Sequence, residues 1–284
     1  MQQICFYHAG CPDGFGAAWS VWRAWKEEGR YVPRGHEHTL EASEYEDAWV
    51  TFVDIAPQND ELLELAALAA RVTVLDHHVT ARDRYLSNSG VVNRVEEGGH
   101  EIVFDLRHSG AVLAWNYFSQ GAPTPDLLRY VEDQDLWNWQ LPDSAAVNAA
   151  IAAYPHRFET WDELSRRPIA DLATEGESIV RANRMEVERV VRYAHPISID
   201  GKPIEAVNAT QNRSAVGHEL AERRAYAVAW SCVYRVGKDR VHATLYSIGD
   251  VDVASIATTL GGGGHHNAAG FSVSLEDWVQ HFVG

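Results

Sequence analysis

The chain has 284 residues, of which 46% are hydrophobic and 23% are charged, as in an ordinary globular protein. This length is sufficient for two domains that each bury a core. The 24 basic and 40 acidic residues give a net charge of −16. Because affinity for long duplex DNA comes mainly from neutralising phosphates with Lys and Arg, this charge argues against a duplex-wrapping protein. The negative net charge does not exclude a small anionic substrate that is held by metal ions and a few local donors.

The sequence also indicates where the protein works. No apolar run approaches the length that spans a bilayer, so no membrane partner is expected. Residues 1–7 lack the basic region of a signal peptide and predict a first strand instead. The three cysteines, Cys5, Cys11 and Cys232, have neither zinc nor redox spacing and cannot all form pairs. We therefore expect a cytoplasmic protein with reduced thiols.

The first candidate site residues follow the first predicted strand. Residues 4–7 lead to His8, and a Gly/Pro loop then leads to Asp13 and a helix whose apolar residues have helical spacing from 17 to 25. An Asp before such a segment is usually an N-cap. The functional alternative is that an imidazole and a carboxylate share one edge of a sheet. An acidic loop is predicted over 35–48.

Two further predicted strands end in acidic residues. One strand covers 49–53 and ends at Asp54; after a helix over 60–70, another covers 72–75 and ends in Asp76-His77-His78. Strand–helix–strand units favour a parallel sheet with right-handed crossovers. Parallel strands end at one edge, where open α/β sheets carry their chemistry, so we expect these side chains to lie close together. The alternative for Asp76 is a helix N-cap followed by two surface histidines.

A further acidic pair ends a predicted helix. The helix body over 127–131 runs into Asp133 and Asp135. Carboxylates at a helix C-terminus oppose the helix dipole, so a positive group is expected nearby, and a metal ion is one candidate. The alternative is that the two residues cap the following turn. The sequence does not decide which of the two would be a ligand.

A charged helix over 171–192 is interpreted as a connector, because charges of both signs alternate with apolar residues. The domains are therefore predicted to be 1–193 and 194–284. The second domain contains four successive glycines, Gly261 to Gly264, followed by His265. Such a run exposes backbone N–H groups and permits close approach to a phosphate; a flexible linker is the alternative. The other predicted elements here are strands at 204–207, 226–230, 241–247 and 271–273 and helices at 214–223 and 252–260.

With these motifs in this order, the chain resembles the DHH phosphoesterases, in the branch that carries the DHH-associated C-terminal domain. The resemblance covers nearly the whole length. It rests on His8 and Asp13, on Asp54, on Asp76-His77-His78, and on the glycine run that continues through His265 to Ala268-Ala269-Gly270. It implies an α/β fold in which a parallel-sheet DHH domain is joined by a helical linker to a smaller α/β C-terminal domain, with the active site in the interdomain cleft.

The resemblance also implies a role for each motif residue. Two Mn²⁺ ions would activate a water for attack on phosphorus. Asp54 would bridge the two ions, Asp76 would orient its neighbours, and His78 would contact the scissile phosphate or the leaving group. The remaining implied roles are metal binding by His8, Asp13, His77 and Asp133, and substrate binding by Gly262, Gly263, Gly264 and His265.

Two departures from the family pattern stand out. The first loop of the family usually carries a second Asp, two residues before or after the one kept here, and these positions are Cys11 and Phe15. Either one metal site lacks a carboxylate or Cys11 is a soft ligand, which would favour Zn²⁺ or Fe²⁺ over Mn²⁺. Relatives also often place an Arg near the substrate at the position of residues 247–249. Arg213 or Arg107 could substitute for it, and the sequence assigns neither.

The favoured function is a metal-dependent phosphoesterase that acts on small nucleotides or short single-stranded oligonucleotides, without long duplex DNA or membrane as partners. The resemblance makes a homodimer one option. A second hypothesis is a nucleotide-binding or regulatory protein whose metal site has degraded. A third is a structural module in which the motif residues are only caps and turns. ATP or GTP hydrolysis through a GxxxxGK[ST] phosphate loop is not expected, because that motif is missing from the sequence.

Overall fold

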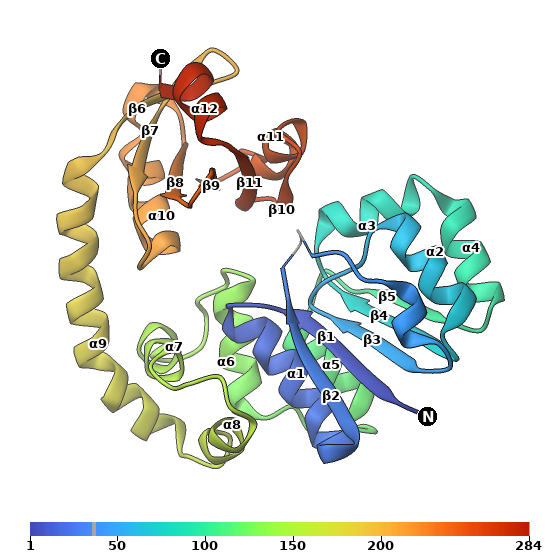
Figure 1. Cartoon of the computed structure of the whole chain (residues 1–284). Helices are drawn as coiled ribbons and strands as arrows, with labels where there is room; N and C mark the ends of the chain where they lie inside the picture. Colours follow the sequence, from blue (N-terminus) through green and yellow to red (C-terminus); the bar gives the residue numbers. More distant parts are fainter. Residues whose placement is uncertain (36–37, 284) are drawn as a thin grey trace. The chain divides into compact units, whose positions relative to one another are not determined.

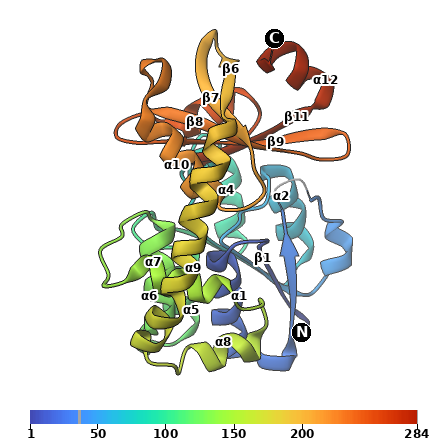
Figure 2. The ribbon, with the colours of Figure 1, turned by 90° about the vertical axis from the view of Figure 1, so that its left-hand side faces the viewer.

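The computed structural model describes residues 1–35 and 38–283, and the chain forms two compact units, Met1–Val180 and Arg181–Gly284 (Figure 1). The division falls inside the long helix α9 (Ile169–Val190), seen from another side in Figure 2. The domain boundary expected after residue 193 stays a prediction. Residues 36 and 37 of the predicted 35–48 loop lie outside the described residues. No helix of the described chain is both long and apolar enough to cross a membrane.

The first unit is built on a five-stranded parallel sheet with the order β2-β1-β3-β4-β5. Three of the strands, β1, β3 and β4, agree with the sequence-based prediction to within two residues. The sequence did not reveal β2, a short edge strand that contains Pro33, a residue which sheets tolerate at an edge. The strands are β1 (Gln3–His8), β2 (Gly29–Arg34), β3 (Trp49–Val53), β4 (Arg71–Asp76) and β5 (Glu101–Phe104).

Helices cover both faces of this sheet, as expected for parallel strands that are apolar throughout. One face, with Phe6, Phe52 and Val74, packs against α2, α3 and α4. The other face packs against α1 and α5. Figure 1 shows the two groups of helices with the strands between them. The helices are α1 (Pro12–Trp25), α2 (Asn59–Leu68), α3 (Val79–Leu86), α4 (Ser89–Glu97) and α5 (Gly110–Phe118).

A second helical layer packs on α1 and α5, and the core between the two layers is rich in tryptophan. It consists of α6 (Asp126–Asp135), α7 (Ser144–Ala152) and α8 (Phe158–Leu164). Trp19, Trp115 and Trp161 lie in its core, and the rings of Trp19 and Trp115 stack with centroids 5.6 Å apart. Because aromatic side chains bury large apolar areas, this layer fixes the positions of α5 and α6, which contribute to the candidate site.

The second unit is a six-stranded sheet with the order β10-β11-β9-β8-β7-β6, antiparallel except for the parallel pair β7–β8. One face packs against α11 (Val253–Thr259) and α12 (Leu275–Trp278), the other against α10 (Arg213–Arg223) and the end of α9. The strands are β6 (His195–Ile199), β7 (Lys202–Asn208), β8 (Trp230–Val236), β9 (Arg240–Ser247), β10 (Gly263–His265) and β11 (Ala268–Ser274).

The α/β fold class with a smaller second α/β unit is confirmed. The strand predicted over 226–230 is wrong, because Tyr226 lies in a short 3₁₀ turn with a φ of 56°, and β8 begins at Trp230. A positive φ at a non-glycine residue is incompatible with an extended strand. The location of the active site in a cleft between the domains stays a prediction.

Candidate metal centre

Three neighbouring strands of the first sheet end at the candidate site. β1 ends at His8, β3 is followed directly by Asp54, and β4 ends at Asp76, with β3 between β1 and β4. Because the strands are parallel, their carboxyl ends lie at one edge of the sheet. His77 and His78 follow β4 at the same edge. Residues that are up to 70 positions apart in the sequence are thereby brought together.

Asp54 lies at the centre of this group and is almost completely buried. Its Oδ1 is 3.0 Å from His77 Nε2, and its Oδ2 is 3.4 Å from His8 Nδ1. Burial raises the pKa of the carboxyl group, but the two imidazoles outweigh burial and hold the pKa well below its usual range. Asp54 has a φ of 59°, a left-handed conformation that Asp and Asn adopt more readily than most residues.

A glycine permits the close packing around Asp54. Gly110, the first residue of α5, lies so near that an added Cβ would come within 2.7 Å of Asp54 Oδ1 and would overlap its Cβ. Real Cβ atoms do not show such contacts, so only glycine fits here without displacement. The sequence analysis missed this residue. In the sequence, the only indication of this residue is that Ser109-Gly110 precedes an apolar helical segment. This pattern by itself predicts only a helix cap.

Asp13 caps a helix, but not its own. Its Oδ2 accepts a hydrogen bond of 2.7 Å from the backbone N–H of Gly110, and its Oδ1 one of 3.0 Å from that of Ala111. The N-cap of α1 is instead Cys11, whose Sγ accepts from Gly14 N. Burial, followed by the charges of Asp135 and Asp54, raises the pKa of Asp13 well above its usual range.

His77 connects Asp13 with Asp135. Its Nε2 is 3.5 Å from Asp13 Oδ2 and 3.6 Å from Asp135 Oδ2. Burial lowers the pKa of His77, but hydrogen bonding and attraction to Asp54, with the charges of Asp13 and Asp135, raise it to about 10. The Oδ2 of Asp135 is buried and makes no hydrogen bond with the residues that the structure describes, and burial together with the Asp54 charge raises the pKa of this carboxyl group. An additional cation would satisfy this oxygen.

The structure places Asp133 differently from the expectation that it is a metal ligand. Its Oδ1 accepts from Gln140 N at 2.9 Å and its Oδ2 from Leu141 N at 3.2 Å, so both oxygens hold the loop that follows α6. Asp133 therefore caps the turn after α6, which was the alternative to metal binding in the sequence analysis. Asp135, the last residue of α6, occupies the position beside His77.

Asp76 orients both histidines that follow it. Its Oδ1 accepts from the backbone N–H groups of His77 and His78, at 2.8 and 3.2 Å, and lies 2.7 Å from His78 Nδ1. Burial raises the pKa of Asp76, but His78 outweighs burial and lowers it, so the carboxyl group is an ionised acceptor. His78 Nδ1 must then carry the proton that it donates, which leaves Nε2 as the nitrogen suited to bind a metal.

Cys11 lies beside His8 and Asp54. Its Sγ is 3.5 Å from His8 Nδ1 and 3.7 Å from Asp54 Oδ2. Burial, followed by the charges of Asp54 and Asp13, raises the pKa of the thiol well above its usual value. Without a cation, Cys11 therefore stays protonated. A metal ion between these three side chains would stabilise the thiolate.

The donor set fits two divalent cations. The ligand atoms of His8, Asp54 and His78 lie within 4.8 Å of one another, and so do those of Asp13, His77 and Asp135. Asp54 contacts an imidazole of each group through a different oxygen. Imidazole and carboxylate ligands suit Mn²⁺, Fe²⁺ and Zn²⁺. The raised pKa of Asp13 and Asp135 shows that burial and mutual repulsion disfavour their charged forms, which a bound divalent cation would stabilise.

The residues expected to bind substrate lie in the second unit. Gly263, Gly264 and His265 form β10, which pairs with β11. An added Cβ at Gly262 would overlap the carbonyl oxygen of Gly270, and Gly264 has a φ of 147°. Packing of the hairpin thus explains these two glycines without a ligand, and their contact with substrate, like that of Gly263 and His265, stays a prediction.

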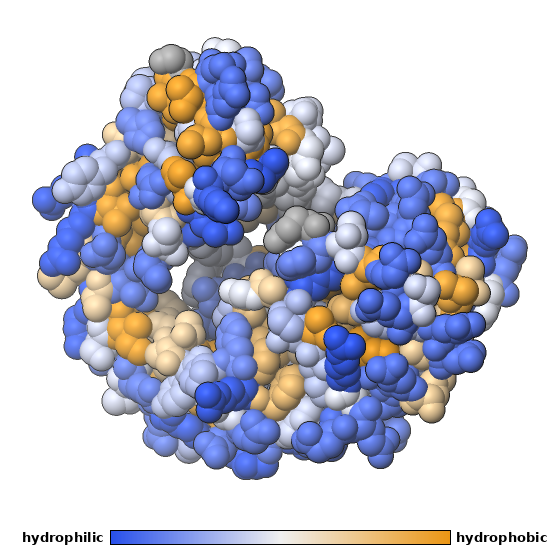
Figure 3. All heavy atoms as spheres, viewed as in Figure 1, coloured by the Kyte–Doolittle hydropathy of each residue, from blue (hydrophilic) through white to orange (hydrophobic). Residues whose placement is uncertain are grey.

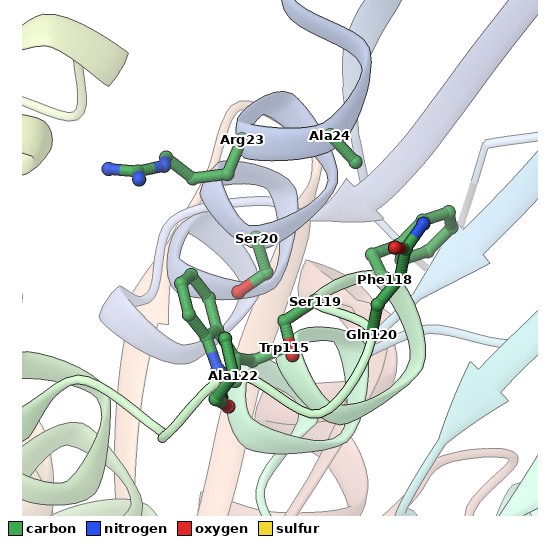
Figure 4. A pocket seen from close by; sticks show the side chains of 8 residues that line it. All are labelled: Ser20, Arg23, Ala24, Trp115, Phe118, Ser119, Gln120 and Ala122. Carbon is green, nitrogen blue, oxygen red and sulfur yellow. Dashed lines mark hydrogen bonds between the residues drawn. The ribbon is translucent and has the colours of Figure 1, made fainter.

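A separate pocket of about 230 Å³ lies between α1 and the end of α5 (Figure 4). Ser20, Arg23 and Trp115 are among its lining residues, and no residue of the candidate metal centre is. Figure 4 shows the Arg23 side chain extending away from the other labelled residues. The pocket therefore does not belong to the site at the sheet edge.

Fold and site together define an α/β protein whose parallel sheet carries buried imidazoles and carboxylates at its carboxyl edge. No family model matches the sequence. The chain is 27% identical, over 293 aligned positions, to an uncharacterized protein of Acanthamoeba polyphaga mimivirus, covering 95% of this chain and 67% of that protein. It is 24% identical, over 267 positions, to the oligoribonuclease NrnB of Bacillus subtilis, covering 84% of this chain and 62% of NrnB. The chain thus spans less than two thirds of the length of NrnB.

Among solved structures, similarity is found to the pGpG-specific phosphodiesterase PggH from Vibrio cholerae, with 12% identity, coverage of 99% and 96%, and a TM-score of 0.46. The DHH domain of a member of the S1p family of ribosomal proteins has 11% identity, coverage of 97% and 83%, and a TM-score of 0.45. Likeness at this level transfers no function. The motif order and the similarity to NrnB confirm the resemblance to the DHH phosphoesterases.

Proposed function

We propose that the chain is a DHH phosphoesterase that uses divalent metal ions to hydrolyse phosphodiester or phosphomonoester bonds of small nucleotides or short oligonucleotides. The observation that carries this proposal is the position of Asp54. Its two oxygens contact different imidazoles, 3.0 Å from His77 and 3.4 Å from His8, as suits a carboxylate that bridges two ions. The oligoribonuclease NrnB, which is similar to 84% of this chain, supports the nucleotide substrate class.

One proposed metal site has three protein ligands, and the other has four because it shares Asp54 with the first. His8, Asp54 and His78 would hold one ion, and Asp13, His77 and Asp135 together with Asp54 would hold the other. Asp135 takes the place that was expected for Asp133. When bound, the two ions would supply Lewis-acid activation of a water and would neutralise charge on the phosphoryl oxygens.

The remaining contributions come from side chains that hold these ligands in place. Asp76 fixes the Nδ1–H form of His78 through a 2.7 Å hydrogen bond and holds the turn after β4 through two backbone N–H groups. Such a carboxylate behind a ligating histidine orients the ring and increases its basicity. Direct contact of His78 with the scissile phosphate or leaving group stays a prediction beside this ligand role.

Cys11 bears on which metal is used. Oxygen-rich sites prefer Mn²⁺, whereas a thiolate ligand shifts preference toward Zn²⁺ or Fe²⁺. Because Cys11 Sγ lies 3.5 Å from His8 Nδ1 and 3.7 Å from Asp54 Oδ2, it is a candidate additional ligand for the ion held by His8. We propose Mn²⁺ for the site of Asp13, and Zn²⁺ or Fe²⁺ as competitors at the site beside Cys11.

The proposed substrates are short and single-stranded. The net charge of −16 disfavours long duplexes, and Figure 3 shows hydrophilic residues over much of the face in view. Gly262, Gly263, Gly264 and His265 are proposed to contribute to substrate binding. The homodimer, the cytoplasmic location and the absence of a membrane partner stay predictions.

The test is hydrolysis of a short RNA oligomer and of a p-nitrophenyl phosphodiester by the full chain with Mn²⁺, Zn²⁺, Fe²⁺ or chelator. Turnover is expected with metal and not with chelator. The matched control is Asp83→Asn, which removes an exposed carboxylate whose ion pair among the described residues is with Arg82, and this variant should behave as wild type. Folded protein that hydrolyses neither substrate with any metal would contradict the proposal. It would favour a nucleotide-binding protein without catalysis, in which Cys11 at a position where the family usually has an Asp leaves the metal site incomplete.

A further inference from the structure

The loop that follows α6 carries two exposed tryptophans. The side chains of Trp137 and Trp139 are 41% and 37% exposed, whereas Trp19 and Trp161 in the neighbouring core are completely buried. The two exposed rings lie edge to face, with centroids 5.0 Å apart and planes at 81°. Because tryptophan is on average a highly buried residue, an exposed pair needs an explanation other than core packing.

The backbone of this loop is also unfavourable for tryptophan and is held firmly in place. Trp137 and Trp139 have φ values of 58° and 51°, in the left-handed region that bulky residues rarely adopt. The carbonyl oxygen of Asp133 accepts from the N–H groups of Asn138 and Trp139, at 2.9 and 3.2 Å. The Asp133 carboxylate accepts from the next two N–H groups of the chain. Strain that the surroundings maintain in this way is typical of ligand-binding segments.

The position of the pair in the chain indicates which ligand it meets. Trp137 comes two residues after Asp135, so their Cα atoms are at most about 7 Å apart. Asp135 is a proposed metal ligand, and the proposed metal ions hold the phosphate of a nucleotide. The base of a nucleotide is one sugar away from its phosphate, which brings it within reach of this loop. Aromatic side chains stack on the flat faces of bases.

We propose that Trp137 and Trp139 bind a nucleobase of the substrate by stacking and thereby select phosphoesters that carry a base. The inference rests on the proposed function for its substrate class. Metal ions bind a phosphoryl group whatever it is attached to, whereas stacking requires a planar ring. Because every base has a π-face, the pair accepts all common bases and discriminates against base-free esters such as sugar phosphates.

The experiment measures binding without metal or turnover. Full-length Asp54→Asn protein in chelator is titrated by calorimetry with two ligands that carry the same phosphates. One is 5′-phosphorylated deoxydiadenylate, and the other is the same dimer with both nucleosides replaced by base-free tetrahydrofuran spacers. We expect the adenylate dimer to bind about 10-fold more tightly, equivalent to about 1.4 kcal/mol, as for one stacked base. Trp137→Asn and Trp139→Asn in the same background should each reduce this preference, and the double variant should abolish it.

Tyr226→Asn is the matched control, because Tyr226 is also exposed and has a φ of 56° but lies in the second unit. It should retain the full preference. Urea unfolding gives a second readout: asparagine adopts the left-handed conformation more readily than tryptophan, so the Asn variants should be at least as stable as the parent protein. Trp139→Phe keeps an aromatic face and should retain part of the preference.

Two results would overturn the inference. One is equal binding of the two dimers by the parent protein. The other is an unchanged preference in the double variant, which together with a loss of stability would show that the tryptophans only support the fold. Failure of the proposed function would appear separately, as absence of metal-dependent hydrolysis by wild-type protein.

Discussion

The two units hold buried or half-buried charged side chains of opposite sign on two kinds of sheet. In the first, the ends of parallel strands gather Asp54 with Asp13 and Asp135, and burial followed by mutual repulsion raises the pKa of the latter two. In the second, one face of a mainly antiparallel sheet holds Arg213 without a carboxylate partner within 4.0 Å among the described residues. The contrast teaches that the ends of parallel strands concentrate carboxylates at one edge of a sheet, whereas the face of the mainly antiparallel sheet half-buries a cation beside a hydroxyl group.

Substitution of the shared carboxylate should have the largest effect. Asp54→Asn is expected to lower metal-dependent turnover by about 10³-fold or more, as loss of a central electrostatic group does. Asn keeps the left-handed conformation with a φ of 59°, which Ala would adopt only with strain. Steady-state hydrolysis measures the effect, and unfolding in chelator verifies the fold. Near-normal turnover would refute the shared-ligand role.

The two acids at the end of α6 should respond in opposite ways. Asp135→Asn is expected to reduce metal affinity and turnover by about 100-fold, the upper value found when a residue that supports a metal ligand is lost. The same variant should raise the stability of metal-free protein, because it removes a buried carboxyl group that Asp54 repels. Asp133→Asn should instead cost about 1–3 kcal/mol of folding free energy, because two backbone N–H groups lose a charged acceptor. Metal titration and urea unfolding of both variants test this. Equal effects of the two would contradict the assignment.

A methyl group beside Asp54 should have a smaller effect on stability. Gly110→Ala is expected to cost about 1–3 kcal/mol, since its Cβ would displace Asp54 from a tightly packed position. Gly90→Ala is the control, because its nearest neighbour would be 3.9 Å away. Urea unfolding in chelator compares the two. A Gly110→Ala variant as stable as Gly90→Ala would show that the packing at Asp54 is loose.

The smallest effects per unit of the varied quantity concern pH, and the two units respond to pH with opposite sign. The pKa of His77 is raised to about 10, so its stabilising contribution is complete below pH 6.5 and is lost as the pH rises toward 10. Burial lowers the pKa of His218 in α10 to about 4, so stability falls as the pH decreases from 6.5 to 4. Each slope is at most about 1.4 kcal/mol per pH unit. In metal-free protein, His77→Gln should flatten only the alkaline limb of the urea-unfolding profile and His218→Gln only the acidic limb.

The sequence predicts those site residues whose positions follow from the order of the strands in the parallel sheet. His8, Asp54 and Asp76-His77-His78 each follow an apolar strand, and a parallel sheet brings strand ends together whatever separates them in the chain. The choice between Asp133 and Asp135 depends instead on packing. Residues two positions apart on a helix point to nearly opposite sides, and the apolar pattern of α6 does not state which side meets the sheet edge.

Long-range contacts of single polar groups could not be predicted from the sequence either. Asp13 caps a helix that begins 97 residues later, and its position before an apolar segment indicates a cap for its own helix. The sequence alone does not distinguish Arg213 from Arg107. Their contacts do, because Arg213 donates to Thr244 and Arg107 donates to Asp105. These contacts depend on how α5 and α10 lie against their sheets, which local patterns do not specify.

Gly110 has a consequence for related sequences. Because a side chain at this position and a carboxylate at position 54 compete for the same volume, the two positions form a linked pair. A relative with a larger residue at the first position of the equivalent helix must have shifted its central carboxylate or lost it. The residue at this position therefore offers a diagnostic for separating relatives that keep the central carboxylate in place from those that keep only the fold.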